Sequence, residues 1–230
     1  MQGSTAQPRS RIASVAGLIV ALGAAFVLPF LPGQAHQRIT DAGQDVGVIV
    51  FEWAVAFTLL ATVIFWERLP LRSIGFRAPS RRDFIALGLA FAAMYAGLGV
   101  AAALTHVTSS DAGGVTMAQI AAVPLVLRIV LFLTAGFCEE LMLRAYAIER
   151  LTLFTGKLWI GGAVVVVLFT LAHVPRYGFS EALMNVAIIA VALTALYMWT
   201  RNFWVCAIMH AIIDCFGLIV GPALATHGHP

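Results

Sequence analysis

The stretch 124–151, PLVLRIVLFLTAGFCEELMLRAYAIERL, places two adjacent glutamates, Glu139 and Glu140, inside an apolar segment. A run of this kind is long enough to cross a bilayer, which takes about 20 residues. A carboxylate at membrane depth is costly, and it indicates a functional site when a partner can be named. His173 and His210 lie in later apolar segments and are such partners. These two acids and two imidazoles therefore define the candidate chemistry.

The composition is that of a membrane protein with several spans. Hydrophobic residues make up 61% of the chain and charged residues only 11%, whereas soluble domains carry about 25% charged residues. No polar segment is long enough for a separate soluble domain. We predict an all-α polytopic membrane bundle, a single domain over residues 1–230 with about seven transmembrane helices. The apolar segments lie at about 12–31, 46–66, 83–105, 122–149, 158–173, 182–200 and 203–222.

The basic residues predict an orientation. If the N-terminus is cytoplasmic, the cytoplasmic segments collect ten of the 14 basic residues, and the opposite side receives Arg38 and Arg176. The loop 67–82, ERLPLRSIGFRAPSRR, carries five arginines and is predicted to be a cytoplasmic connector that contacts lipid headgroups. This basic face is a topology signal and predicts no nucleic-acid partner.

The same signals predict an integral multi-pass protein of a bacterial cytoplasmic membrane. We expect the first apolar segment to be retained, because it is long for the apolar part of a signal peptide. All three cysteines, Cys138, Cys206 and Cys215, lie in apolar segments without CxxC spacing. They are predicted to be packing residues and not disulfide partners. The sequence predicts no oligomeric state.

Helical geometry gives the two glutamates different roles. Glu140 and Arg144 are four residues apart, about 40° around a helix, and are predicted to form an ion pair. Glu139 points about 100° away from Glu140 and has no cation on its own helix. It lies 16 residues before Thr155, and His173 lies 18 residues after it. Both are then about 24–27 Å from the turn at 153–157, so Glu139 and His173 are expected to be level on adjacent helices.

The histidines belong to two short patterns. His173 follows Phe169 by four residues, and His210 precedes Asp214 by four, so each pair shares one helix face. Glutamate, two histidines and an aspartate match a zinc ligand set with an open position. They equally match a carboxylate and a histidine that activate water without metal. The residue types do not decide between these alternatives.

Three motifs carry a family resemblance: Glu139-Glu140-Leu-Met-Leu-Arg144, Phe169-Thr-Leu-Ala-His173 and His210-Ala-Ile-Ile-Asp214. In order and spacing they resemble the EExxxR, FxxxH and HxxxN/D motifs of the CPBP family. That family includes the CaaX prenyl endopeptidases (Rce1-type) and the bacteriocin-immunity (Abi) proteins. The resemblance covers about residues 133–217, within a predicted catalytic core at about 122–222.

The resemblance implies an intramembrane endopeptidase in which Glu139 and His173 activate water. It assigns support of that carboxylate to Glu140 and Arg144, with Phe169 beside His173, and the oxyanion or a metal to His210 and Asp214. The implied metal is Zn²⁺, with Glu139, His173, His210 and Asp214 as ligands, and a metal-free mechanism stays open. The implied substrate is a membrane-associated peptide or protein, with prenylated CaaX-like tails among the candidates.

The chain departs from the family pattern at two positions. Ala145 stands where glycine usually follows the arginine, and Asp214 stands where asparagine is commonest. An ionised aspartate cannot donate a hydrogen bond to an oxyanion. It must therefore be protonated, orient His210 or bind metal, and this favours the metal interpretation here.

Two other interpretations concern the same buried acids. A non-catalytic membrane immunity or scaffold protein would hold these residues as a structural polar cluster. A proton-coupled transporter is disfavoured, because the halves of the chain show no matching pair of broken helices. Glu52, in the second apolar segment beside Trp53, is interpreted as an interfacial residue.

Overall fold

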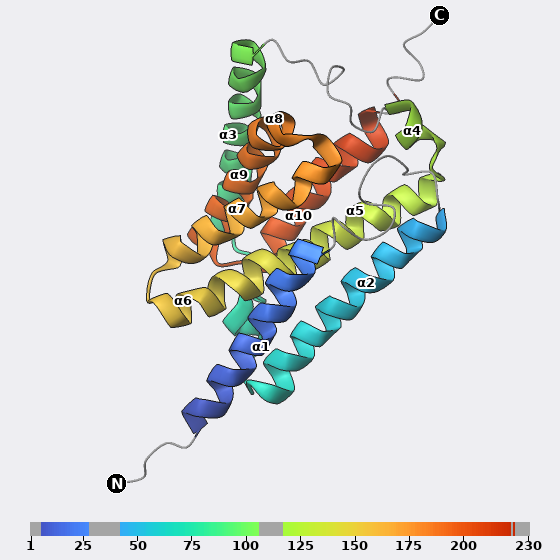
Figure 1. Ribbon diagram of the computed structural model, residues 1–230. Coiled ribbons are helices and arrows are strands. Elements are labelled where there is room, and N and C mark those ends of the chain that lie inside the picture. The colour runs from blue at the N-terminus through green and yellow to red at the C-terminus, as the bar shows by residue number, and fades with distance from the viewer. Residues whose placement is uncertain (1–5, 28–41, 106–116, 222, 224–230) are drawn as a thin grey trace, which may run out of the picture.

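The computed structural model describes residues 6–27, 42–105, 117–221 and 223, and these residues form helices and short connections without any strand. In chain order the elements are α1 (Ala6–Val27), α2 (Ala42–Ala61), η2 (Thr62–Trp66), η3 (Leu71–Ile74), α3 (Arg81–Thr105), α4 (Met117–Ala122), α5 (Leu125–Glu139), η4 (Glu140–Ile148), α6 (Glu149–Thr155), α7 (Leu158–Tyr177), α8 (Phe179–Glu181), η5 (Ala182–Val186), α9 (Ala187–Thr200), α10 (Phe203–Cys215) and η6 (Phe216–Val220) (Figure 1). The predicted all-α class is confirmed.

A central rod of α5, η4 and α6 organises the bundle. Helices α1 and α2 pack on one part of this rod, while α7 and α10 pack on others (Figure 1). Every residue of η4 is buried, including Glu140 and Arg144. The two acids of the opening motif therefore lie at the junction of α5 and η4, in the middle of the protein.

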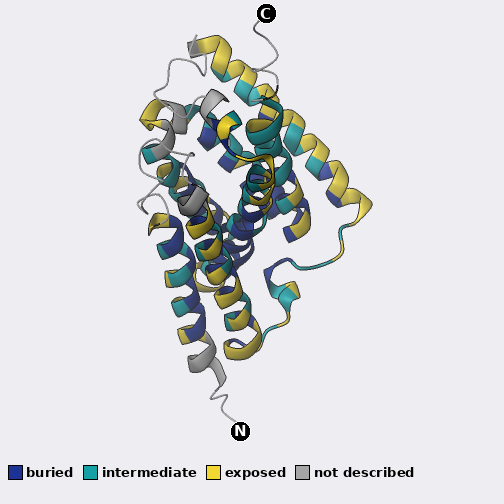
Figure 2. Cartoon of the chain, turned by 90° about the vertical axis from the view of Figure 1, so that its right-hand side faces the viewer, coloured by how far each residue is buried: buried dark blue, intermediate teal, exposed yellow. Residues whose placement is uncertain are grey.

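The outer faces of the helices are apolar, as expected for a protein surrounded by lipid. The exposed residues of α1, α2, α3 and α5 include many large apolar side chains. Exposed residues lie on the outer faces of the helices, and buried residues face the interior of the bundle (Figure 2). An apolar outer surface of this extent indicates a membrane environment. The structure thus supports an integral multi-pass membrane protein.

Five helical stretches are long and apolar enough to span a membrane: Val46–Trp66, Arg81–Leu104, Leu158–Pro175, Leu183–Thr200 and Phe203–Val220. Each matches one of the predicted segments. The first predicted segment is represented by the shorter apolar helix Arg11–Val27, and residues 28–31 lie outside the described part. The fourth, 122–149, begins at the break between α4 and α5 and consists mainly of α5 and η4, which carry the charged motif. The count of seven and the cytoplasmic N-terminus stay predictions.

Two local details of the helices can be compared with the sequence pattern. Helix α5 begins directly after Pro124, because proline lacks an N–H that the first turn would leave unpaired. Helix α7 extends beyond the predicted apolar segment 158–173. It continues through Pro175 to Tyr177 and ends at Gly178, whose φ is +82°. A proline so close to the end removes a single hydrogen bond, so the last turn survives.

The arginine-rich end of the bundle is fixed by a buried ion pair. Arg150 donates to both carboxylate oxygens of Glu67, with the shortest contact at 2.6 Å. Ser14 and Tyr146 donate to Oε1 of the same carboxylate at 2.7 and 2.9 Å. Glu67 therefore connects α1, η4 and α6 to the connector that follows η2. Burial alone would raise the pKa of Glu67, but these donors outweigh it and hold the pKa below its ordinary value.

Candidate active site

The site begins with a close approach between α5 and α10. A Cβ atom on Gly136 of α5 would lie 3.1 Å from both the Cβ and the backbone nitrogen of Ala211 on α10. Only glycine allows the two helices to meet at this distance without a shift, in the manner of small residues at membrane helix contacts. The contact brings the end of α5, with its two glutamates, against His210 on α10.

Replacing Gly136 with valine is expected to reduce activity by separating these helices. The added methyl groups must push α10 away from α5, and a misplacement of about 1 Å can cost about 10²-fold in rate. Peptide-cleavage kinetics, with Gly99→Val as the control, would check this. A Cβ on Gly99 meets nothing within 4 Å. Equal rates in the two variants would contradict a role for the close contact.

Glu140 is the buried centre of the site. Its Oε1 accepts a hydrogen bond from Nη1 of Arg144 at 2.7 Å, and this confirms the predicted ion pair. The same oxygen lies 2.8 Å from Nδ1 of His210, a contact that the sequence did not predict. Glu140 and Arg144 have no exposed side-chain surface. Glu140 thus holds a cation on its own helix and an imidazole on α10 at once.

Arg144 is held by an aromatic face as well as by Glu140. Its guanidinium carbon lies 4.3 Å from the centre of the Phe169 ring on α7, a favourable cation–π distance. Among the described residues, Nε and Nη2 of Arg144 and Oε2 of Glu140 have no hydrogen-bond partner. Orphaned buried polar atoms are rare and call for an explanation. They are consistent with a site kept polar for function.

His210 presents its second nitrogen to two further acids. Nε2 lies 3.5 Å from Oδ2 of Asp214 and 3.9 Å from Oε2 of Glu139. The Asp214 contact shows that the predicted one-face placement of this pair is correct. The distance to Glu139 is too long for a hydrogen bond. The acids therefore surround the imidazole, with Glu140 on the Nδ1 side and the other two on the Nε2 side.

The two adjacent glutamates differ in exposure. Glu139 keeps 16% of its side-chain surface accessible, whereas Glu140 keeps none. Asp214 is more open, at 28%. Glu139 and Asp214 are therefore partly accessible, whereas Glu140 is fully buried.

His173 joins the site through Phe169. Its Nδ1 lies 2.7 Å from the backbone oxygen of Phe169, so a neutral ring carries its proton there and its lone pair on Nε2. The two rings lie 4.4 Å apart, and Phe169 lies 6.0 Å from the His210 ring in an edge contact. Phe169 thus touches both histidines and Arg144. The predicted pairing of His173 with Glu139 stays a prediction.

Glu52 of α2 is a buried acid whose place the sequence did not indicate. Only 4% of it is exposed, its Oε2 has no hydrogen-bond partner within the described part of the chain, and its charged neighbours there are Glu139, His210 and Asp214. The interpretation as an interfacial residue is therefore wrong. The neighbouring Trp53 donates to Thr134 and stacks on Phe137 of α5. This packing directs α2 toward the site. In the sequence, Glu52 stood out only as an acid among apolar neighbours.

The arrangement of acids and histidines does not by itself form a metal cage. Among the described residues, no group of three or more His, Cys, Asp or Glu side chains is arranged to hold a metal ion. The implied Zn²⁺ ligand set of Glu139, His173, His210 and Asp214 is therefore not assembled in advance around an ion in the described part of the chain. That ligand set stays a prediction.

The protein is an all-helical membrane bundle with acids and histidines gathered in its interior. It therefore belongs to the class of polytopic membrane proteins with an internal acid–imidazole site. Residues 119–216 match the family model described as type II CAAX prenyl endopeptidase, Rce1-like. This match agrees with the family resemblance predicted from the three motifs. No curated protein and no solved structure matches the chain. The matched region contains Glu139, Glu140, His173, His210 and Asp214, and it supports a membrane endopeptidase.

Proposed function

We propose that the protein is an intramembrane endopeptidase that hydrolyses a peptide bond of a prenylated, CaaX-like substrate near the membrane surface. The observation that carries the proposal is the asymmetric pair of acids. Glu139 is accessible and faces His210, while Glu140 is sealed and bonded to Arg144 and His210. A structural cluster needs no such division. The match of residues 119–216 to a prenyl endopeptidase family model supports the proposed substrate class.

In the proposed reaction, Glu139 and His173 activate a water molecule. Glu139 takes a proton from the water as the water oxygen attacks the carbonyl carbon of the scissile bond. The lone pair that His173 carries on Nε2 orients the same water. The proton then passes to the leaving nitrogen as the C–N bond breaks. General base catalysis of this kind contributes about 10²–10⁴-fold.

His210 and Asp214 are proposed to act on the other side of the carbonyl. With a proton on both ring nitrogens, His210 donates through Nδ1 to Glu140 and through Nε2 to the developing oxyanion. Asp214, 3.5 Å from Nε2, orients the ring in the free enzyme and gives way to the substrate oxygen. Glu140 and Arg144 hold the ring from behind.

The test is cleavage of a farnesylated fluorogenic CaaX peptide by the purified protein in lipid vesicles, with the unprenylated peptide alongside. We expect cleavage of the farnesylated peptide, and a loss of about 10²–10⁴-fold in His173→Ala. His227→Ala, which changes a histidine beyond the last apolar segment, is the matched control. A His173→Ala protein that cleaves at the wild-type rate would refute the mechanism.

The alternative is a non-catalytic membrane immunity or scaffold protein. The orphaned oxygen of Glu140 and nitrogens of Arg144 are the observations against it, since a purely structural cluster gains by satisfying them. Under this alternative His173→Ala lowers the melting temperature and no peptide is cleaved by any variant. Thermal unfolding of the same preparations separates the two functions.

A further inference from the structure

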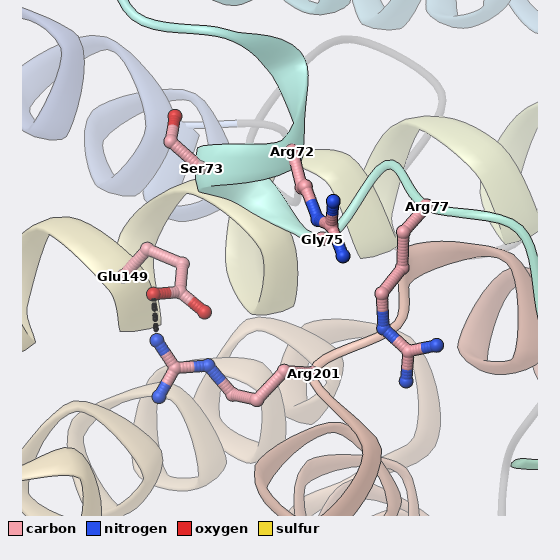
Figure 3. Close-up of a pocket in the computed structure, with 6 residues that line it drawn as sticks. All are labelled: Arg72, Ser73, Gly75, Arg77, Glu149 and Arg201. Atoms are coloured by element: carbon pink, nitrogen blue, oxygen red, sulfur yellow. Dashed lines mark hydrogen bonds and ion pairs between the residues drawn. The ribbon is translucent and has the colours of Figure 1, made fainter.

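A second polar site lies at the arginine-rich end of the bundle, apart from the acid–histidine site. It is a pocket of about 330 Å³ lined by Arg72, Ser73, Gly75, Arg77, Glu149 and Arg201 (Figure 3). This volume falls within the range of about 300–1,000 Å³ that is usual for ligand pockets. Three guanidinium groups, drawn from the connector after η2 and from the turn between α9 and α10, meet in one pocket.

The pocket carries an excess of positive charge. Arg77 pairs with Asp83 through two contacts of 2.7 and 2.9 Å, and Arg201 pairs with Glu149. No acid pairs with Arg72 in the described part of the chain. Three arginines against two acids leave a net charge of +1 in the site. One singly charged anion would balance it.

The arginines are held in place before any ligand arrives. Arg77 donates to the backbone oxygen of Thr200 at 2.5 Å, and its Asp83 partner keeps the pKa of Arg77 raised. Gly75 has a φ of +81°, and a Cβ there would lie 3.0 Å from the Tyr197 hydroxyl and 3.1 Å from the Phe203 nitrogen. Glycine therefore lets the connector rest on the turn between α9 and α10. The preformed geometry lowers the entropic cost of binding.

The position of the pocket relative to the membrane surface indicates which kind of molecule supplies the anion. Four of the five candidate spans end beside it, at Trp66, Arg81, Thr200 and Phe203. Three tryptophans at these ends, Trp66, Trp199 and Trp204, are exposed by 51%, 51% and 40%. Exposed tryptophan is typical of the membrane–water interface, where lipid phosphates lie. A phospholipid phosphodiester carries the single negative charge that the pocket lacks.

We propose that this pocket binds the phosphodiester of an anionic phospholipid. The guanidinium of Arg72 pairs with the phosphate oxygens, and Arg77 and Arg201 share their outward N–H groups with it. Their side chains keep 27% and 44% of their surface exposed while bonded to their acids. Ser73, whose hydroxyl accepts from Arg150 at 3.3 Å, donates its own hydrogen to the ligand. The bound lipid ties the connector to the membrane surface.

The experiment measures binding of short-chain phosphatidylglycerol to the purified full chain in detergent, by thermal unfolding and by native mass spectrometry. We expect saturable stabilisation and one retained lipid. Loss of a charge-assisted contact in Arg72→Gln weakens binding by about tenfold or more. Arg82→Gln is the matched control, because Arg82 is an exposed arginine in the first turn of α3, at the end of the same connector, and does not line the pocket. It should bind as the wild type does.

Inorganic phosphate and short-chain phosphatidylcholine form the two comparison arms. Stabilisation by phosphate alone, with no effect of the lipid, would overturn the lipid source in favour of a free phosphate. Equal binding by Arg72→Gln and Arg82→Gln would overturn the site itself, since it would show only non-specific attraction to the basic face. Arg72 is exposed, so its variant should fold. Peptide cleavage is not needed for any readout, and the proposal stands apart from the proposed function.

Discussion

Glu139→Gln is expected to lower the turnover of a cleavable peptide by about 10²–10⁴-fold while leaving the protein folded. Glutamine has nearly the same shape as glutamate but cannot take a proton from water. Glu139 forms no hydrogen bond with His210, and the ion-pair contact between them is long, at 3.9 Å, so the substitution removes only a weak contact. Turnover should fall, and the melting temperature in detergent should stay close to that of the wild type.

Glu140→Gln is the matched comparison, because the same chemical change is made one residue along. Here Arg144, which has no exposed surface, loses the anionic contact that Glu140 makes with it, and His210 loses an ionised acceptor. Removing one member of a buried ion pair costs about 3–5 kcal/mol. We therefore expect Glu140→Gln to lower both the melting temperature and the turnover.

The two variants together separate a catalytic pair from a structural cluster. If Glu139→Gln and Glu140→Gln lose stability alike, both acids are structural and the proposed division of roles is wrong. If Glu139→Gln keeps full turnover, another group is the base, and Glu52 is the next candidate because it is buried beside Glu139. Steady-state kinetics and thermal unfolding on one preparation give both readouts.

Much of the fold follows from hydrophobic run length. The apolar stretches predicted five helices that the structure also has at spanning length, because about 20 apolar residues in a row are stable as a helix in lipid. The breaks in these helices were harder to predict. η4 is π-helical, and α7 passes through Pro175. Both features depend on packing against neighbouring helices, and the spacing of residues along the sequence gives no information about that packing.

In the candidate site, the local contacts could be predicted from the sequence and the long-range contacts could not. The Glu140–Arg144 pair lies four residues apart, so helix periodicity was sufficient to predict it. The contact between Glu140 and His210 spans 70 residues and depends on the glycine contact between α5 and α10. Glu52 enters the site because α2 packs against α5. Neither could be read from spacing along one helix.

Glu67→Gln is expected to destabilise the protein by about 3–5 kcal/mol without touching the acid–histidine site. Its carboxylate accepts from Arg150, Ser14 and Tyr146, and neither it nor Arg150 has more than 2% of its side chain exposed. The neutral amide leaves the Arg150 charge buried and uncompensated. Thermal unfolding in detergent measures the loss. Ser14→Ala, which removes one neutral donor to the same carboxylate, is the control and should cost about 1 kcal/mol.

The pH dependence of unfolding gives this ion pair a second test. Because the pKa of Glu67 is lower in the folded protein than its ordinary value of 4.5, the folded state binds fewer protons than the unfolded state there. Its stabilisation is complete above that ordinary value and is lost as the pH falls through the folded-state pKa. As the pH is lowered, the melting temperature should therefore fall more steeply for the wild type than for Glu67→Gln. Parallel curves would show that Arg150 and the hydroxyls do not stabilise the charged carboxylate, and that α1, η4 and α6 are joined by packing alone.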